Sequence, residues 1–399
     1  MTRSIITGID IGTHHIKVVI ADGNEKRLER DEKNNQPKIL GVGLVETRGL
    51  RHGYVLNIAD VVSSIRQAVA QAEKKAEAKV KKAYLSIGGI GLGSITSTSS
   101  IIISRADSEI TALDIKKIQD QCEKDIPSSI SLNKKIIHSI PVQYKIDGKV
   151  VLGKPEGMHG SKFEIKTLYI TSLEQHLNDI IEAVEDAGIS VQDVMASPIA
   201  ASLVTLTKSQ KIAGCVLVNI GAETVSLAVF ENNIPVSLEV FPIGSTDITN
   251  DIALGLKVPL EEAEQIKIGA ITGSSYPRKK LEEIIFARLS DIFELIEAHL
   301  KKIGRNGLLP AGIILTGGGS GLSGIEEMAK TSLRLPSRIG ILNLGISEKS
   351  GLKDSSWAVA YGLCILGMHA DQDMPIDTSS RIFAHSKKTV VAWLKQFLP

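Results

Sequence analysis

Apolar and polar positions alternate at the start of the chain in the way that β-strands require. Two runs rich in β-branched residues, 5–11 and 16–20, flank a short tip of small and polar residues, which predicts a β-hairpin. The apolar run at 39–45 predicts a third strand. From 57 to 82 the apolar positions follow helical spacing, so we expect a long amphipathic helix there.

Strands and helices alternate through the middle of the chain. Pro141 lies inside one predicted strand, which predicts an edge position because proline has no N–H to donate. The β-α pattern that starts at residue 163 resembles the opening unit, so the segment between them is expected to be an insertion. The expected elements are strands at 84–87, 95–103, 136–146 and 163–171, and helices at 111–124 (with Thr111 as its N-cap), 173–187 and 197–205.

The opening pattern recurs half a chain later, at residues 215–230. Asn219-Ile220-Gly221 stands there where Asp10-Ile11-Gly12 stands in the first copy, so we infer an internal duplication. The remaining pattern predicts helices at 247–256, 260–268, 280–302, 325–333 and 357–368, with a buried strand that runs into glycines at 311–324.

Composition narrows the class of protein. The 399-residue chain is 43% hydrophobic with a formal net charge of +1, so it has room for two or three domains, and nucleic acid is not expected as a main partner. Three cysteines lie far apart, which favours neither a zinc site nor a disulfide framework. No apolar run reaches the roughly 18 residues of a membrane-spanning helix, and the first residues do not resemble a signal peptide.

The tip of the first hairpin carries groups that suit a phosphate. Gly12 lets backbone N–H groups approach an anion, Thr13 adds a hydroxyl, and Asp10 offers hard oxygen ligands for a divalent cation. A purely structural buried hairpin is the alternative, and the second copy favours nucleotide binding over it. A competing G-x-G-x-x-G pattern at 319–324 lies late in the chain, with no acidic residue at a strand end about 20 residues on, as a dinucleotide site would require.

The two Asp/Asn-x-Gly hairpins, the segment 197–202 and the late glycines 317–319 together resemble the actin, Hsp70 and sugar-kinase superfamily. Within it, the chain is similar to the FtsA family of bacterial cell-division proteins. The most specific match is the run 138–148, continued at 154–160, which resembles the subdomain that FtsA carries in place of one actin subdomain. Residues 49–53 and 263–269 also look like family signatures.

The resemblance implies an actin-like, two-lobed α/β fold with duplicated phosphate hairpins, an inserted small α/β subdomain, and bound ATP and Mg²⁺. Asp10 is expected to contact the metal. For Glu264 and Lys267, implied to meet ribose and adenine, the alternative is an exposed salt bridge between positions i and i+3. The implied nucleotide-binding residues are Asp10, Gly12, Thr13, Lys17, Asn219, Gly221, Thr224, Glu264, Lys267, Gly317, Gly318 and Gly319.

Two positions depart from relatives that hydrolyse ATP. Those relatives begin the second hairpin with Asp and the preceding helix with Glu or Gln, whereas this chain has Asn219 and Ser197. Asparagine carries no negative charge toward a hydrated Mg²⁺, and serine alone orients water poorly. We therefore expect tight ATP–Mg²⁺ binding with slow or absent hydrolysis.

The end of the chain changes character after residue 368. Residues 369–386 are polar and typical of a linker, and the apolar positions of 387–399 then follow helical spacing on one face. This pattern predicts an amphipathic helix on a membrane surface, with docking on protein as the alternative; the FtsA family has a membrane-targeting helix there. The residues expected to meet lipid are Lys388, Val390, Trp393, Leu394, Lys395, Phe397 and Leu398.

By resemblance, the protein polymerises and tethers filaments of the tubulin-like FtsZ to the cytoplasmic face of the membrane at the division site. FtsZ is expected on 247–302, and other division proteins on the inserted subdomain. Two alternatives stay open: an actin-like scaffold of type IV pilus assembly, and a small-molecule kinase. The expected organisation is 1–82 and 163–205 for the first lobe, 83–162 for the insertion, 206–350 for the second lobe, 351–368 for the final helix, 369–386 for the linker and 387–399 for the amphipathic helix.

Overall fold

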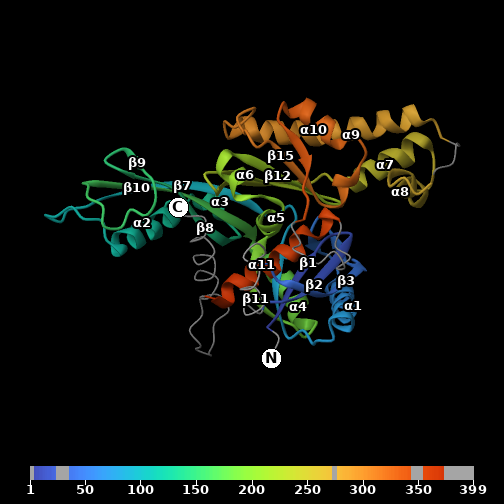
Figure 1. The fold of residues 1–399 in the computed structure, drawn as a ribbon, viewed down its shortest axis with the longest axis horizontal. Helices are drawn as coiled ribbons and strands as arrows, with labels where there is room; N and C mark the ends of the chain where they lie inside the picture. The colour runs from blue at the N-terminus through green and yellow to red at the C-terminus, as the bar shows by residue number, and fades with distance from the viewer. Residues whose placement is uncertain (1–3, 24–35, 272–275, 343–353, 373–399) are drawn as a thin grey trace.

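The computed structural model describes residues 4–23, 36–271, 276–342 and 354–372. Figure 1 shows two lobes, one above the other in this view, and a third sheet that projects sideways from them. Buried apolar side chains form three clusters: one fills the first lobe and continues onto one face of the second-lobe sheet, one lies in the second lobe, and one lies in the projecting sheet. Among the described helices, none combines the length and apolar character needed to cross a bilayer. The amphipathic segment 387–399 lies outside the described residues.

The first lobe is built on a five-stranded sheet. Its strands follow the order β11-β6-β1-β2-β3, in which β1, β2 and β3 form an antiparallel meander and β6 and β11 run parallel to β1. This confirms the predicted hairpin and third strand. The bounds are β1 (Ile5–Ile11), β2 (His15–Asp22), β3 (Lys38–Glu46), β6 (Lys82–Ile87) and β11 (Ser190–Ala196).

Helix α1 (Ile58–Ala76) covers β2 and β3, and is shorter than predicted. Its N-cap Asn57 accepts hydrogen bonds from the N–H groups of Ala59 and Asp60, as the first turn of a helix requires. The predicted end at residue 82 is wrong, because Glu77 takes a left-handed conformation and Lys82 already begins β6. Apolar spacing alone did not show this boundary.

The second lobe repeats the first. Its sheet follows the order β14-β13-β12-β15-β16, again with three antiparallel strands followed by two parallel ones. The duplication therefore extends beyond the hairpin to the whole sheet. The elements are β12 (Cys215–Ile220), β13 (Val225–Glu231), β14 (Ile234–Phe241), β15 (Ile313–Thr316), β16 (Ser337–Ile339), α7 (Ser245–Leu256), α8 (Leu260–Lys267), α9 (Arg278–Lys302) and α10 (Ile325–Leu333).

The projecting part is a four-stranded antiparallel sheet in the order β7-β10-β8-β9. Thr111 forms a capping box with Asp114 at the start of α2, which confirms the predicted N-cap. Pro141 pairs with Thr167 where the register between β8 and β10 shifts, and β9 pairs only with residues 144–146, so the proline lies on an open stretch of its strand. The elements are β7 (Gly93–Ile102), β8 (Lys134–Ile146), β9 (Lys149–Val151), β10 (Lys162–Leu173), α2 (Ala112–Lys124) and α3 (Ser128–Ser131).

Two helices, α5 (Ser197–Thr205) and α11 (Ala358–Gln372), pack against each other where the lobes meet, and α11 also packs against β1 of the first hairpin. A Cβ on Gly362 of α11 would lie 1.9 Å from the Ala200 carbonyl oxygen of α5, and one on Gly8 of β1 would lie 2.2 Å from that of Ala360. Glycine is needed at both positions because the backbones touch. The remaining elements are β4 (Leu50–Arg51), β5 (Tyr54–Val55), α4 (Glu174–Asp186), α5 (Ser197–Thr205), α6 (Lys208–Ala213), α11 (Ala358–Gln372) and the short 3₁₀ turns η2 (Gly318–Gly321) and η3 (Ser355–Trp357).

Candidate functional site

The first hairpin holds its tip in a fixed shape. The Gly12 N–H donates to the His15 carbonyl at 3.1 Å, and the Thr47 hydroxyl donates to the Gly12 carbonyl at 2.7 Å. Asp10 and Lys17 are direct partners across the two strands, so their side chains lie on the same face of the sheet. A carboxylate and an ammonium group therefore stand side by side just below the tip.

Asp10 is a buried carboxylate, and only 9% of the residue is exposed. Burial raises its pKa, while the Lys17 charge and a hydrogen bond of 2.8 Å from the Ser86 hydroxyl to Oδ1 oppose that shift. A nearby divalent cation would further favour the ionised form. The donor set at this position thus fits the proposed role of Asp10 toward Mg²⁺.

The second hairpin copies the tip geometry of the first. The Gly221 N–H donates to the Thr224 carbonyl at 2.9 Å, matching the bond between Gly12 and His15 three residues apart in the first copy. The start of α7 closes the tip, because the N–H groups of Ser245 and Thr246 donate to the carbonyls of Gly221 and Ala222 at 2.9 and 2.8 Å. The tip and α7 therefore form one rigid unit.

The three late glycines have different surroundings. A Cβ on Gly317, whose φ is +87°, would lie 2.3 Å from Asn219 Oδ1, and one on Gly319 would lie 2.4 Å from Ile220 Cγ2. Gly318 has no atom within 4 Å of that position among the described residues. Gly317 and Gly319 thus let η2 press against β12, and Gly318 alone faces open space that a ligand could fill.

Glu264 and Lys267 form an ion pair of 2.7 Å on α8, and the pair is part of a network. The Thr249 hydroxyl donates to Glu264 Oε2 at 2.6 Å, and Lys267 Nζ donates to the Thr249 oxygen at 2.8 Å and to the Ser245 carbonyl at 3.1 Å. The ion pair between positions i and i+3 named by the alternative interpretation is present, with the Lys267 side chain 7% exposed and the Glu264 side chain 36% exposed, so the lysine is buried and the carboxylate is partly open to solvent.

Groups in both lobes change the pKa of the Glu264 carboxyl group. Burial alone would raise its pKa, but hydrogen bonds from Lys267 and Thr249 outweigh burial and lower it. His14, in the tip of the first hairpin, also lowers this pKa through its charge. The first hairpin tip in one lobe and α8 in the other are therefore near enough to interact electrostatically.

Ser197 and Asn219, the two positions that differ from ATP-hydrolysing relatives, each contact a neighbouring strand or turn. Ser197 is buried, and its hydroxyl donates to the Ile87 carbonyl at 2.8 Å. Asn219 pairs with Ser226 across the second hairpin, and its side chain lies beneath Gly317. Ser197 thus serves the junction between α5 and the end of β6, which leaves its proton committed to the backbone.

Glu223 in the second hairpin tip is a residue that sequence reasoning missed. Its carboxylate accepts a short hydrogen bond from the N–H of His52, and His52 Nδ1 lies 3.3 Å from the Glu223 carbonyl oxygen. The two residues are 171 positions apart and belong to different lobes. A carboxylate in a hairpin that should meet phosphates was the available signal, but its partner could not be read from spacing.

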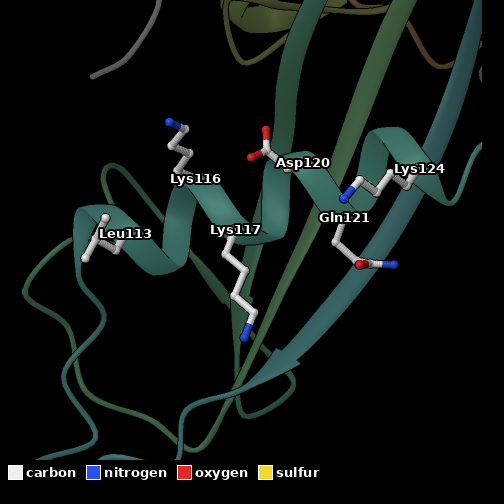
Figure 2. A pocket seen from close by; sticks show the side chains of 6 residues that line it. All are labelled: Leu113, Lys116, Lys117, Asp120, Gln121 and Lys124. Carbon is white, nitrogen blue, oxygen red and sulfur yellow. The ribbon is translucent and has the colours of Figure 1, made fainter.

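Other features bear less on this site. A pocket on α2 is lined by six side chains, whose positions on the helix Figure 2 shows: Leu113, Lys116, Lys117, Asp120, Gln121 and Lys124. It belongs to the projecting sheet and not to the hairpins.

Within the described part of the chain, no three His, Cys, Asp or Glu side chains cluster so as to hold a metal ion. The predicted lipid-facing residues 388–398 lie outside the described residues.

Comparison with protein families identifies two matching models. The model described as cell division protein FtsA matches residues 216–362, and the model described as the SHS2 domain inserted in FtsA matches residues 91–171. The second match falls on the projecting sheet, as the resemblance of 138–148 and 154–160 predicted.

Relatives of similar length carry the same name. The cell division protein FtsA of Pseudomonas aeruginosa is 28% identical, with 99% of this chain and 97% of the relative covered. That of Neisseria meningitidis is 30% identical, with 92% and 89% covered.

Solved structures share the fold. The PilM–PilN type IV pilus biogenesis complex matches with a TM-score of 0.67 at 19% identity, covering 92% of this chain and 99% of the other. MreB5 of Spiroplasma citri bound to ADP matches with a TM-score of 0.52 at 12% identity, covering 94% and 99%. At these identities the likeness concerns the fold alone.

Proposed function

Because the chain belongs to the FtsA family of actin-like cell-division proteins, we propose that it binds ATP with Mg²⁺ between its lobes and holds it with slow or no hydrolysis. In this state it tethers FtsZ filaments to the cytoplasmic face of the membrane at the division site. One observation carries the nucleotide part: two hairpins with the same tip hydrogen bond stand in the two halves of a duplicated fold.

Each hairpin would contribute a different group to the nucleotide. Thr13 and Lys17 in the first tip, and Gly221 and Thr224 in the second, would hold the phosphates through hydroxyl, ammonium and backbone N–H groups. Asp10 would hold Mg²⁺, and Asn219 at the matching position of the second hairpin offers only a neutral oxygen donor. The cation would offset the negative charge of the phosphates when bound.

The adenosine end of the site would lie on the second lobe. Glu264 is ionised and fixed by Lys267 and Thr249, so it would accept hydrogen bonds from ribose hydroxyls without reorganising. Gly318 leaves open space on the η2 turn, where the adenosine could lie against the backbone. Gly317 and Gly319 would then serve the nucleotide indirectly, by keeping that turn against β12.

Slow hydrolysis is supported by what the chain lacks at two positions. Asn219 provides no second carboxylate, and the Ser197 hydroxyl is donated to the Ile87 carbonyl. Neither group would orient an attacking water strongly. Bound ATP would then act as a clamp that favours one arrangement of the lobes.

FtsZ would dock on the second lobe, on the outer surface of α7, α8 and α9. Large apolar side chains are exposed there, with Leu254 79%, Ile268 60% and Phe286 61% accessible. If these side chains are contiguous in the complex, they would supply its apolar contacts, since contiguous exposed apolar surface marks protein-binding sites. Other division proteins would contact the inserted sheet, and residues 387–399 would bind lipid through their apolar face, aided by the avidity of a polymer.

Titration of the full chain with ATP, with and without Mg²⁺, tests the nucleotide part. Asp10→Asn should weaken ATP binding roughly tenfold in Mg²⁺, the effect of losing about 1.5 kcal/mol from one charged contact. The same variant should change binding little in EDTA. Asp60→Asn on the exposed face of α1 is the matched control. Absence of saturable binding by the wild-type chain would refute the proposal.

Turnover separates a clamp from an enzyme. Steady-state phosphate release should be far slower than the roughly 1–100 s⁻¹ of ordinary kinases. A screen for phosphoryl transfer to small hydroxyl compounds addresses the kinase alternative, and a positive result would favour it. The pilus-scaffold alternative shares the fold at 19% sequence identity, whereas the cell-division relatives are 28% and 30% identical over 99% and 92% of the chain.

A further inference from the structure

We propose that Glu223 and His52 form a latch between the lobes that slows nucleotide exchange. Glu223 lies in the tip of the second phosphate hairpin, so the latch rests on the proposed nucleotide site. It deepens that proposal by naming the contact that must break before a nucleotide can leave.

The His52 half of the latch is anchored in the first lobe. His52 lies in the turn between β4 and β5 with φ +49°, and its carbonyl accepts the Ile90 N–H at 3.2 Å. A Cβ on the next residue, Gly53, would lie 2.5 Å from the Gly89 Cα, so this turn packs directly on the loop after β6. The backbone N–H of His52 therefore points from a fixed position.

The Glu223 half is equally fixed in the second lobe. It stands in the tip closed by the bond from the Gly221 N–H to the Thr224 carbonyl. A Cβ on Gly244 would lie 2.2 Å from the Ala222 carbonyl oxygen, so the start of α7 presses on the same tip. The carboxylate thus leaves a rigid hairpin toward the other lobe.

Three contacts join these halves. The His52 N–H donates to Glu223 Oε2, His52 Nδ1 lies 3.3 Å from the Glu223 carbonyl oxygen, and the same nitrogen lies 4.0 Å from Oε2. The side chains are 35% and 27% exposed, so water only partly screens the contact. Both the backbone and the side chain of His52 take part.

The Glu223 carboxylate lies in a hairpin proposed to bind phosphates, so its contact with His52 would affect how well the nucleotide is retained. A free carboxylate in the tip of a phosphate-binding hairpin would repel a polyphosphate. Engaging it with an N–H group and an imidazole offsets its charge while the lobes are together. Separation of the lobes breaks the contact and returns the bare carboxylate to the site, so the closed state is the one that retains the nucleotide.

The test measures release of a fluorescent ATP analogue from the full chain after mixing with excess ATP. Glu223→Ala should raise the release rate about tenfold, because loss of a partly buried hydrogen bond to a charged carboxylate acts mainly on dissociation. His52→Ala keeps the backbone N–H and should raise it less, and the double variant should not exceed Glu223→Ala. Glu327→Ala, in an exposed ion pair on α10, is the control.

A second readout keeps the latch separate from the nucleotide proposal. In nucleotide-free protein, Glu223→Ala should speed hydrogen exchange of peptides covering 49–55 and 219–226, and Glu327→Ala should not. If the wild-type chain binds no nucleotide, the proposed function fails, and this exchange experiment still decides whether Glu223 and His52 hold the lobes together. Unchanged exchange, or unchanged release from a variant with intact affinity, would overturn it.

Discussion

At the scale of single residues, the late glycines divide into positions that the fold requires and one that it leaves open. Gly317 combines a positive φ with backbone and side-chain atoms of Ile220 and Asn219 within 3.0 Å of the position that a Cβ would take. Gly318, its neighbour, has no such contact among the described atoms. The three adjacent glycines thus differ in role: Gly317 and Gly319 allow close packing against β12, and Gly318 leaves open space.

Gly317→Ala should therefore destabilise the protein by about 2 kcal/mol or more, since alanine is strained at positive φ and its methyl group would overpack the hairpin. Urea unfolding of the nucleotide-free chain measures the change. Gly318→Ala is the matched control and should lie within about 0.5 kcal/mol of wild type. Equal losses in the two variants would contradict the assignment.

Asp193 on β11 is a buried carboxyl group whose Oδ2 has no hydrogen-bond partner among the described residues. Burial raises its pKa to about 7, although the Val194 N–H, which donates to Oδ1 at 2.8 Å, opposes the shift. The unfolded value is about 3.9. Between these values the folded state binds more protons than the unfolded state, so the contribution of Asp193 to stability falls as pH rises.

Asp193→Asn should remove this dependence. Relative to wild type, the variant should gain stability between pH 4 and pH 8, with an upper limit of roughly 4 kcal/mol for three units of pKa shift. Urea unfolding at several pH values checks the slope. Asp60→Asn, on an exposed helix surface, provides the comparison. A difference between wild type and Asp193→Asn that does not change with pH would contradict the prediction.

At the scale of elements, one side chain staples the inserted sheet to the second lobe. The Ser94 hydroxyl, on β7, donates to the Leu238 carbonyl at 2.7 Å and accepts the Leu238 N–H at 2.9 Å. Leu238 lies on β14, the outer strand of its sheet, which α9 holds through a contact of 2.8 Å between Ser237 Oγ and His299 Nε2. A movement of β14 would therefore be felt in the insertion.

Ser94→Ala should leave two backbone groups of β14 without their partner and cost about 1–2 kcal/mol of stability. It should also speed hydrogen exchange at the Leu238 amide. Thr98→Ala, at an exposed position on the same strand, is the control. Unchanged protection of Leu238 in the Ser94 variant would show that the staple does not hold the two elements together.

Sequence patterns were sufficient to predict the elements with strong periodicity, but they did not predict every strand. Helix α9 and both hairpins carry strong periodicity and formed where it predicted. Strands β11 and β14 were not predicted. Each reads as an ordinary polar and apolar alternation after a helix or turn, and each becomes a strand because a neighbouring strand supplies its hydrogen bonds.

At the scale of the whole molecule, the proposed tether predicts two separable functions. Removal of residues 387–399 should abolish co-sedimentation of the protein with vesicles that contain anionic lipid, because the apolar face and the lysines are lost together. ATP affinity of the shortened chain should stay within about twofold, since the lobes are intact.

A stricter experiment adds FtsZ to the same sedimentation assay. FtsZ should pellet with vesicles only when the full chain is present, and Trp393→Glu in the full chain should act like the truncation, because a charge on the apolar face opposes burial in lipid. Lys330→Glu, at an exposed position on α10 outside the proposed FtsZ surface, is the control for a surface charge change of similar kind. Vesicle binding that survives both changes would contradict the lipid role of the segment.

The sequence by itself determined the repeated unit. Apolar runs around an Asp/Asn-x-Gly tip specify a hairpin locally, so both copies, the helices with strong periodicity and the family were readable without coordinates. The departures at Asn219 and Ser197 were readable too, since they depend only on which residue occupies a matched position.

Tertiary structure alone decided which distant residues meet. The pairs of His52 with Glu223 and Ser94 with Leu238 join residues 171 and 144 positions apart, and no periodicity reports such a distance. Tertiary structure also decided that Lys267 and Asp193 are buried, because other elements of the fold pack around both side chains. Local patterns fix local hydrogen bonds, whereas contacts between lobes depend on how two separately formed sheets come together.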